Sequence, residues 1–345
     1  MLTRSIRSFW VGLLATLIGA SLLLHSWWNP KERHLPAPPP FLPISSSTYL
    51  SSANDGELAH CLLLYGLFGT GKRMRDADLL LLGTSHVAMG LSAEILSRRM
   101  SAALGRPFRV YNAGLGHAER WAFISQVIQH NQIENQKILF DLYGIRGDGM
   151  SPWAEVVRSG NALKSTVLAG NVWSGYMEKW LFYRFVPHIS IAQHYAQNPR
   201  SDILFYPMQF LDDAYWFRNL ETGDTSAFWS PTSGMIYSTA APPIPNIPNS
   251  LVDAAFLEPV IRQNHLTPFL TLIPFLGFNS QEAALEAHAV GHPFIFLNGN
   301  GMGYWDGGTH LDSASRDIVT ERLFLQMQAE KLDSPLVFPV RKKAK

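Results

Sequence analysis

Cysteine and net charge are both scarce in this sequence, and each scarcity excludes a class of protein. Cys61 is the only cysteine among 345 residues, so no disulfide can form within the chain. It lies in the apolar stretch AHCLLLYGLF and is interpreted as a small buried hydrophobic residue. The formal net charge is +1, from 28 basic and 27 acidic residues, which gives no support to nucleic-acid binding.

Motifs for metal and cofactor binding are missing as well. The His, Asp and Cys residues are scattered without the spacing of metal ligands, so we expect no metal site. No glycine-rich loop has the full spacing of a dinucleotide or phosphate site, so we expect no cofactor. Hydrophobic residues, in contrast, make up 47% of the chain, which is enough to build one large core or two ordinary ones.

The N-terminus has the pattern of a membrane anchor. Residues 9–24 contain no charged side chain, and Ser8–Trp28 has the length of about 20 residues that a helix needs to cross a bilayer. Arg4 and Arg7 precede it and favour a cytoplasmic N-terminus. We expect residues 1–30 to be a cytoplasmic stub and a single transmembrane helix, with the rest of the protein outside the cytoplasm. A cleaved signal peptide and a buried helix are the alternatives.

Composition divides the rest of the chain into three parts. Residues 31–54 include the proline-rich stretch Pro36–Pro43 and are predicted to be an extended linker. Residues 55–335 are predicted to be an α/β domain, and residues 336–345 a basic tail. Over about 150–250 the alternation of strands and helices stops, which indicates a large insertion. It either forms a lid or binding wall or is a surface excursion.

The α/β domain is predicted from apolar runs that alternate with amphipathic segments. Strands are expected within residues 77–83, 107–114, 137–144, 265–275 and 292–298. Helices are expected over residues 55–68, 91–104, 118–130, 251–263, 282–290 and 313–331, with Ser92 as the N-cap and Gly105 as the stop of the second. This alternation predicts a parallel sheet with helices on both faces.

Several polar residues and one glycine follow predicted strands. They are Ser85, Gly114, Arg146 and His310. Ligand sites of parallel sheets lie beyond the carboxyl ends of the strands, so these residues are candidates for one site. A serine at a strand-to-helix turn can act as a nucleophile if a histidine held by a carboxylate takes its proton. His310 and Asp306 lie in one loop and could supply both groups.

Four motifs, LLLGTSH, NAGLGH, YGIRGD and DGGTHLD, together resemble the four conserved blocks of the SGNH (GDSL-like) hydrolase superfamily. The resemblance covers roughly residues 76–332 without the insertion. It implies a flavodoxin-like three-layer α/β/α fold with a parallel sheet. It also implies that Ser85 is the nucleophile, that Ser85 and Gly114 donate backbone amides to the oxyanion hole, that His310 is the base and that Asp306 orients it.

Two features depart from the family pattern. The third block lacks the asparagine that completes the oxyanion hole, so Arg146 or Asn112 is a candidate replacement, unless Arg146 pairs with Asp148 or another neighbour. Asp306 and His310 are four positions apart where the family has three, and the two glycines between them could absorb the extra residue.

Two further residues near the motifs are candidates for substrate binding. Trp305 could stack on a sugar ring, and His86 adjoins the nucleophile. The alternative is core packing for Trp305 and a supporting role at the start of a helix for His86.

The anchor and the missing asparagine are most similar to the polysaccharide O-acetyltransferase branch of the superfamily, which includes alginate-acetylation proteins and the accessory protein of teichoic-acid D-alanylation. This resemblance implies a bacterial inner-membrane protein with its domain in the periplasm, and a cell-surface or secreted polysaccharide as substrate. It also implies a multispan membrane O-acyltransferase or a polysaccharide synthase complex as partner. The alternatives are an esterase, a non-catalytic component of a polysaccharide synthesis or export complex, and a lipid or thioester hydrolase.

Overall fold

The computed structural model describes most of the predicted α/β domain. The described residues are 48–53, 56–116, 119, 121–145, 150–160, 215–228, 236–237, 257–275, 291–305, 310–334 and 337–338, with the single positions 164, 167, 170 and 287. The predicted anchor Ser8–Trp28, the proline-rich stretch, Arg146, Asp306 and the C-terminal basic residues lie outside this part. Among the described residues, no helix combines the length and apolarity that a membrane crossing requires.

A five-stranded parallel sheet forms the centre of the fold. Its order is β10-β9-β5-β3-β4, and every neighbouring pair is parallel. The strands are β3 (Leu79–Leu82), β4 (Val110–Asn112), β5 (Lys137–Asp141), β9 (Thr267–Thr271) and β10 (Phe294–Ile295). Each lies within a strand expected from the sequence, so the predicted mixed α/β class is confirmed. From β3 the chain adds β4 on one side and the later strands on the other, which places a topological switch point between β3 and β5.

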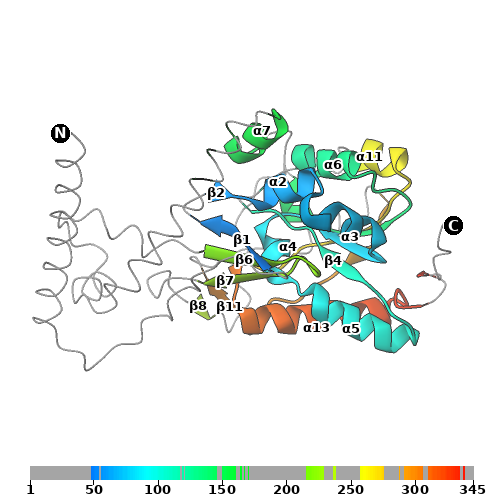
Figure 1. Ribbon diagram of the computed structural model, residues 1–345. Helices are drawn as coiled ribbons and strands as arrows, with labels where there is room; N and C mark the ends of the chain where they lie inside the picture. Colours follow the sequence, from blue (N-terminus) through cyan, green and yellow to red (C-terminus); the bar gives the residue numbers. More distant parts are fainter. Residues whose placement is uncertain are drawn as a thin grey trace, which may run out of the picture.

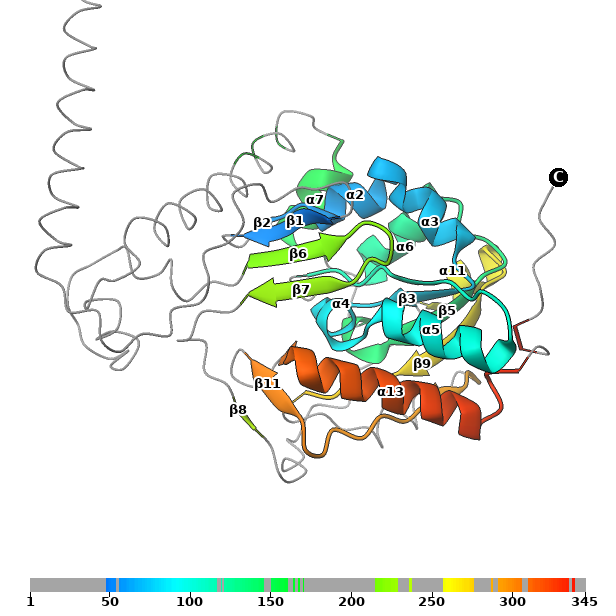
Figure 2. The same ribbon diagram turned by 60° about the horizontal axis from the view of Figure 1, so that its bottom comes forward.

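Helices cover both faces of this sheet (Figures 1 and 2). One face carries α5 (Ala93–Leu104) and α13 (Ser313–Ala329), which pack against each other. The other carries α2 (Ala59–Leu64), α3 (Thr70–Asp76), α6 (Trp121–His130) and α11 (Leu257–Gln263). The helix α7 (Pro152–Arg158) packs on α2.

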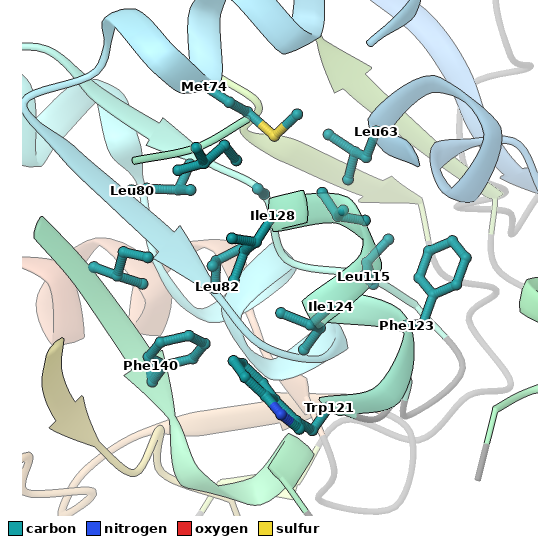
Figure 3. Close-up of a cluster of buried hydrophobic side chains, with 14 of the residues drawn as sticks. Leu63, Met74, Leu80, Leu82, Leu115, Trp121, Phe123, Ile124, Ile128 and Phe140 are labelled. Atoms are coloured by element: carbon teal, nitrogen blue, oxygen red, sulfur yellow. The ribbon is translucent and has the colours of Figure 1, made fainter. Parts of the chain in front are cut away.

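The four leucines of β3 explain why both faces need cover. Successive side chains of a strand point to opposite faces. Leu80 and Leu82 accordingly belong to the hydrophobic cluster beneath α6, and Leu79 and Leu81 to the cluster beneath α5 and α13. Figure 3 shows Leu80 and Leu82 in the first cluster, packed with Trp121 and other side chains. A run of apolar residues with no polar alternation is thus the signature of a strand buried on both sides.

Local sequence signals set the ends of α5 and the start of α13. The Ser92 side chain accepts a hydrogen bond from the Ile95 amide and caps α5, and Gly105 ends it in the left-handed conformation with φ 63°. Asp312 caps α13 by accepting from the Ser315 amide at 2.6 Å. The predicted start and stop of α5 are confirmed.

Two antiparallel sheets were not expected from the sequence. One has the order β2-β1-β6-β7, with β1 (Thr48–Ala53), β2 (Gly56–Glu57), β6 (Tyr215–Asn219) and β7 (Thr225–Phe228). It lies at one end of the molecule (Figures 1 and 2). The other has the order β12-β11-β8, with β8 (Ile236–Tyr237), β11 (Gly303–Trp305) and β12 (His310–Leu311).

These sheets correct two expected boundaries. Strand β1 occupies the end of the segment predicted as linker, because residues 48–52 pair with residues 216–219 of β6. The helix expected over residues 55–68 is shorter: β2 takes residues 56–57, α2 begins only at Ala59, and a 3₁₀ turn, η1 (Leu67–Gly69), follows. At β1 a partner distant in sequence overrides the local pattern, and at β2 the override comes from a hairpin with the adjacent β1.

Candidate active site

Ser85 is the first residue of α4 (Ser85–Gly90), directly after β3 and a two-residue turn. The turn requires glycine at position 83, since a Cβ there would lie 2.5 Å from Val87 Cγ2 and 2.9 Å from Asp141 Cβ. The Thr84 side chain accepts from the His86 amide at 3.2 Å and caps the helix. The sequence therefore places Ser85 at the carboxyl end of a central strand, beside the switch point of the sheet.

His310 reaches Ser85 from the C-terminal part of the chain. Its Nε2 lies 2.8 Å from Ser85 Oγ, although 225 positions separate the two residues. The histidine sits in β12, which is held by antiparallel pairing to β11. Ser85 is 6% exposed and His310 8%. This is the contact that a histidine needs in order to take the proton of a serine hydroxyl.

The amides expected near an oxyanion differ in their availability. The Ser85 N–H donates to none of the described residues. The Gly114 N–H donates to Asn112 Oδ1 at 3.0 Å. The Asn112 Nδ2 donates to the carbonyls of Val87 and Leu91, at 2.9 and 3.0 Å. Asn112 thus ties the middle and the C-terminal end of α4 to β4, and both hydrogens of its Nδ2 are engaged. A role for the Gly114 amide at an oxyanion requires it to share its hydrogen with Asn112 Oδ1.

Gly114 packs directly against the turn that carries the nucleophile. A Cβ at this position would lie 2.4 Å from Ala88 N and 3.0 Å from Thr84 O. Only glycine fits this approach of the β4 loop to α4, which explains the residue type whether or not its amide meets a substrate.

His86 is buried beside the Ser85–His310 pair, with 3% of its surface exposed. Its ring lies between Tyr143 and Phe275, with centroid distances of 4.1 and 5.0 Å, and meets His310 edge-on at 5.7 Å. Its Nδ1 is 3.9 Å from Asp141 Oδ2, too long for a hydrogen bond. Burial, with a smaller contribution from the charge of His310, lowers the pKa of His86 to about 3.

Asp141 ends β5 and is fully buried. Burial raises its pKa to about 7, against the opposing effect of hydrogen bonds from the Ile273 and Tyr143 amides. Burial therefore favours the neutral form of both Asp141 and His86. Between about pH 3 and pH 7 the two form a neutral pair rather than an ion pair, and Asp141 ionises above that range. Asp141 is not among the site residues predicted from the sequence, and it lies within the strand expected over residues 137–144.

Two more residues near the site were missed, and both come from β6 in the predicted insertion. The Trp216 ring lies 6.2 Å from the His310 ring, and the Arg218 guanidinium donates to the carbonyls of Asn112 and Gly114. No local pattern could have identified them, because β6 reaches the site only through its pairing with β1 and β7.

The other predicted site residues are placed in part. The backbone of Trp305 pairs with His310 in the β11–β12 ladder. Asp306 and Arg146 lie outside the described residues. In the described part of the chain, no group of three or more His, Cys, Asp or Glu side chains has the geometry to hold a metal ion.

Comparisons of the chain with models of protein families, with curated proteins and with solved structures find no match.

Proposed function

We propose that Ser85 is the nucleophile of an acyl-transfer site like that of the SGNH hydrolases, with His310 as its general base. The observation that carries this proposal is the 2.8 Å contact between His310 Nε2 and Ser85 Oγ at the carboxyl end of β3. Ligand sites of parallel sheets lie at that edge. The strand order supports the same family, because β4-β3-β5-β9-β10 corresponds to 2-1-3-4-5 in chain order, as in flavodoxin-like folds.

The proposed reaction has two steps. In the first, Ser85 Oγ attacks the carbonyl carbon of an acyl donor while His310 Nε2 takes the hydroxyl proton. The tetrahedral intermediate collapses to an ester on Ser85, and the imidazolium of His310 returns the proton to the leaving group. In the second step, His310 takes the proton of an acceptor hydroxyl, and the acceptor oxygen attacks the carbonyl carbon of the Ser85 ester. The tetrahedral intermediate collapses with loss of Ser85 Oγ, the imidazolium of His310 returns the proton to that oxygen, and the acyl group stays on the acceptor.

Backbone amides would stabilise the oxyanion. The Ser85 N–H, which has no acceptor among the described residues, is the first donor we propose. Gly114 would be the second, with its N–H shared between Asn112 Oδ1 and the oxyanion. Arg146 is proposed as a further donor and Asp306 as the carboxylate that orients His310.

For the biological acceptor we propose a hydroxyl group of a cell-surface or secreted polysaccharide, with acetyl as the acyl group. A single-pass anchor at Ser8–Trp28 would hold the domain in the bacterial periplasm beside a multispan membrane O-acyltransferase or a polysaccharide synthase complex. Hydrolysis follows the same path with water as acceptor, so an esterase is the same proposal with a different second step.

A non-catalytic role in such a polysaccharide complex is the second candidate. The observation that favours it is the engagement of the Asn112 and Gly114 amides within the protein, which leaves neither free for an oxyanion.

A comparison of serine and histidine variants tests the proposal. We expect the full chain in detergent to release acetate from an activated acetyl ester, and Ser85→Ala and His310→Ala to reduce kcat by roughly 10³-fold or more. Ser125→Ala and His130→Ala, on α6, are matched controls and should retain the activity. Equal background rates in all five proteins would refute catalysis by Ser85. An added oligosaccharide then separates transfer from hydrolysis by the appearance of acetylated sugar.

A further inference from the structure

The β6–β7 hairpin belongs to the long segment between the two halves of the α/β pattern, yet it is fastened to the α/β core. The Asp224 carboxylate accepts from the Ala93 and Glu94 amides at 2.6 and 3.0 Å and so covers the start of α5. The Thr222 carbonyl accepts from the Asn112 amide at 2.8 Å. Gly223, at φ 74°, fits so closely that a Cβ would lie 2.0 Å from Asn112 O. These contacts fix the hairpin in one position against α5 and the end of β4.

Arg218 of β6 is the largest of the fully buried side chains, with 1% exposure. Its Nη1 donates to the Gly114 carbonyl at 2.7 Å, and its Nη2 donates to the Asn112 carbonyl. No carboxylate among the described residues pairs with it, and its Nε has no acceptor there. Burying a cation without a counter-ion is unfavourable, so a residue selected only for stability would more commonly be apolar at this place.

The two carbonyls that Arg218 holds flank a single peptide unit. The Asn112 carbonyl precedes, and the Gly114 carbonyl follows, the peptide whose N–H belongs to Gly114. With both neighbours held by one planar guanidinium, the direction of the Gly114 N–H is fixed as well. Arginine suits this task because its donors form a rigid fork, whereas the ammonium group of lysine offers no fixed plane.

Trp216 lies two positions before Arg218, so both side chains are on the same face of β6. The Trp216 ring is 8% exposed and meets the His310 ring at 6.2 Å with an interplanar angle of 73°. One face of one strand therefore contacts both the loop of Gly114 and the histidine that bonds Ser85.

We propose that β6 is a working part of the Ser85 site, in which Arg218 is the positioning residue for the Gly114 peptide and Trp216 is the positioning residue for the His310 ring. This inference rests on the function proposed above, since it assigns what orients the base and an oxyanion donor. The segment that contains β6 is then needed for catalysis. The buried positive charge of Arg218 lies next to the Gly114 loop, where it favours the negative charge that develops on the oxyanion.

The test compares arginine variants by kinetics and by amide hydrogen exchange in the full chain. Arg218→Lys should lower kcat for the activated ester by 10- to 100-fold, change KM by less than about threefold, and speed exchange at residues 113–115. Arg106→Lys is the matched control, because Arg106 also donates to backbone carbonyls, those of Pro107 and Phe338. It should leave kcat and the exchange at 113–115 unchanged.

A second variant separates the hydrogen bonds of Arg218 to the Gly114 loop from the attachment of the β6–β7 hairpin to α5. Asp224→Asn weakens the contact with α5 and keeps Arg218, so exchange should rise at residues 93–95 while kcat changes by less than about twofold. For Trp216, the Ala variant should lower kcat about tenfold and the Phe variant should restore most of it, with KM little changed in both.

The outcomes distinguish this inference from the proposed function. If the unmodified chain shows no esterase activity, the proposed function fails, while exchange at 113–115 still tests the grip of Arg218. If Arg218→Lys leaves both kcat and the local exchange at the unmodified values, the inference is overturned. If Arg218→Lys is unfolded, the variants Trp216→Ala and Trp216→Phe test the inference instead. Equal kcat values in these two variants and the unmodified protein would contradict a role of β6 in the site.

Discussion

Two histidine–carboxylate pairs are buried in the described part of the chain, and they differ in hydrogen bonding. His60 Nε2 lies 2.8 Å from Glu119 Oε2, with both side chains fully buried. His86 Nδ1 lies 3.9 Å from Asp141 Oδ2, and these side chains are buried to nearly the same degree. The first pair is a hydrogen bond, and the second is a contact between groups that are not bonded to each other.

The surroundings of the carboxylates explain the difference. Glu119 also accepts from the Ser151 hydroxyl at 2.6 Å and from the Ser151 amide at 3.2 Å, so one carboxylate connects α2, the loop after β4 and the start of α7. Asp141 Oδ2 has no hydrogen-bond partner in the described part of the chain. The two pairs therefore differ in hydrogen bonding and not in depth of burial. Hydrogen bonds to Glu119 hold three segments together, whereas His86 and Asp141 are not bonded to each other and burial favours their neutral forms.

The neutral pair has a consequence for the proposed chemistry. His86 adjoins the ring of His310, and two neighbouring imidazolium ions would repel each other. Since burial lowers the pKa of His86 to about 3, His86 would stay uncharged in the proposed step in which His310 takes the proton of Ser85.

Removing the His60–Glu119 hydrogen bond should have the largest effect on stability. Glu119→Ala leaves the buried His60 ring and the half-buried Ser151 hydroxyl without their acceptor, which we expect to lower the free energy of unfolding by about 3–5 kcal/mol. Urea denaturation followed by circular dichroism measures it. Glu155→Ala, in the first turn of α7, is the control and should change stability by no more than about 0.5 kcal/mol. A loss below 1 kcal/mol for Glu119→Ala would mean that the hydrogen bonds of Glu119 to α2 and to the start of α7 do not stabilise the fold.

The neutral pair can be tested through pH. The folded pKa of Asp141, about 7, exceeds its ordinary value of 3.8, so its contribution to stability is largest at low pH and is lost as pH rises from about 4 to about 7. Asp141→Asn removes this decline. The variant should therefore gain on the unmodified protein between pH 4.5 and pH 8, by at most about 4 kcal/mol from a shift of roughly three pKa units.

Urea denaturation at the two pH values measures the gain of Asp141→Asn. Asp317→Asn removes a carboxylate that is 48% exposed and serves as the control, with the same difference from the unmodified protein at both pH values. A constant difference for Asp141→Asn as well would show that Asp141 is ionised throughout.

The contrast between local and distant contacts also explains how much could be predicted. The strands of the parallel sheet and the limits of α5 follow from an apolar run, a capping serine and a terminal glycine, all of which act within a few residues. The pairing of Ser85 with His310 is predicted from their places after strands of a parallel sheet and from motifs that resemble a family, and the geometry brings the two residues together.

The supporting residues could not be predicted, because each depends on contacts between distant segments. Strand β1 lacks a continuous apolar run, and it becomes a strand by pairing with β6 and β2. Arg218 and Trp216 acquire their neighbours through that pairing. Asn112 was expected to donate to an oxyanion, and it instead donates to two carbonyls of α4, which no spacing in the sequence indicates.

His86→Phe should have the smallest effect on stability, and comparing it with His60→Phe contrasts the two histidines most directly. Neither ring nitrogen of His86 has a hydrogen-bond partner among the described residues, and the ring already lies between Tyr143 and Phe275. At pH 7.5, His86→Phe should therefore change the free energy of unfolding by less than about 1.5 kcal/mol, as do other volume-conserving changes in cores. His60→Phe leaves Glu119 without the imidazole donor and should lose about 3 kcal/mol or more. Urea denaturation of the two variants side by side measures both values. Equal losses would show that depth of burial alone decides the contribution of each histidine, since the two sites differ chiefly in whether the ring is hydrogen-bonded.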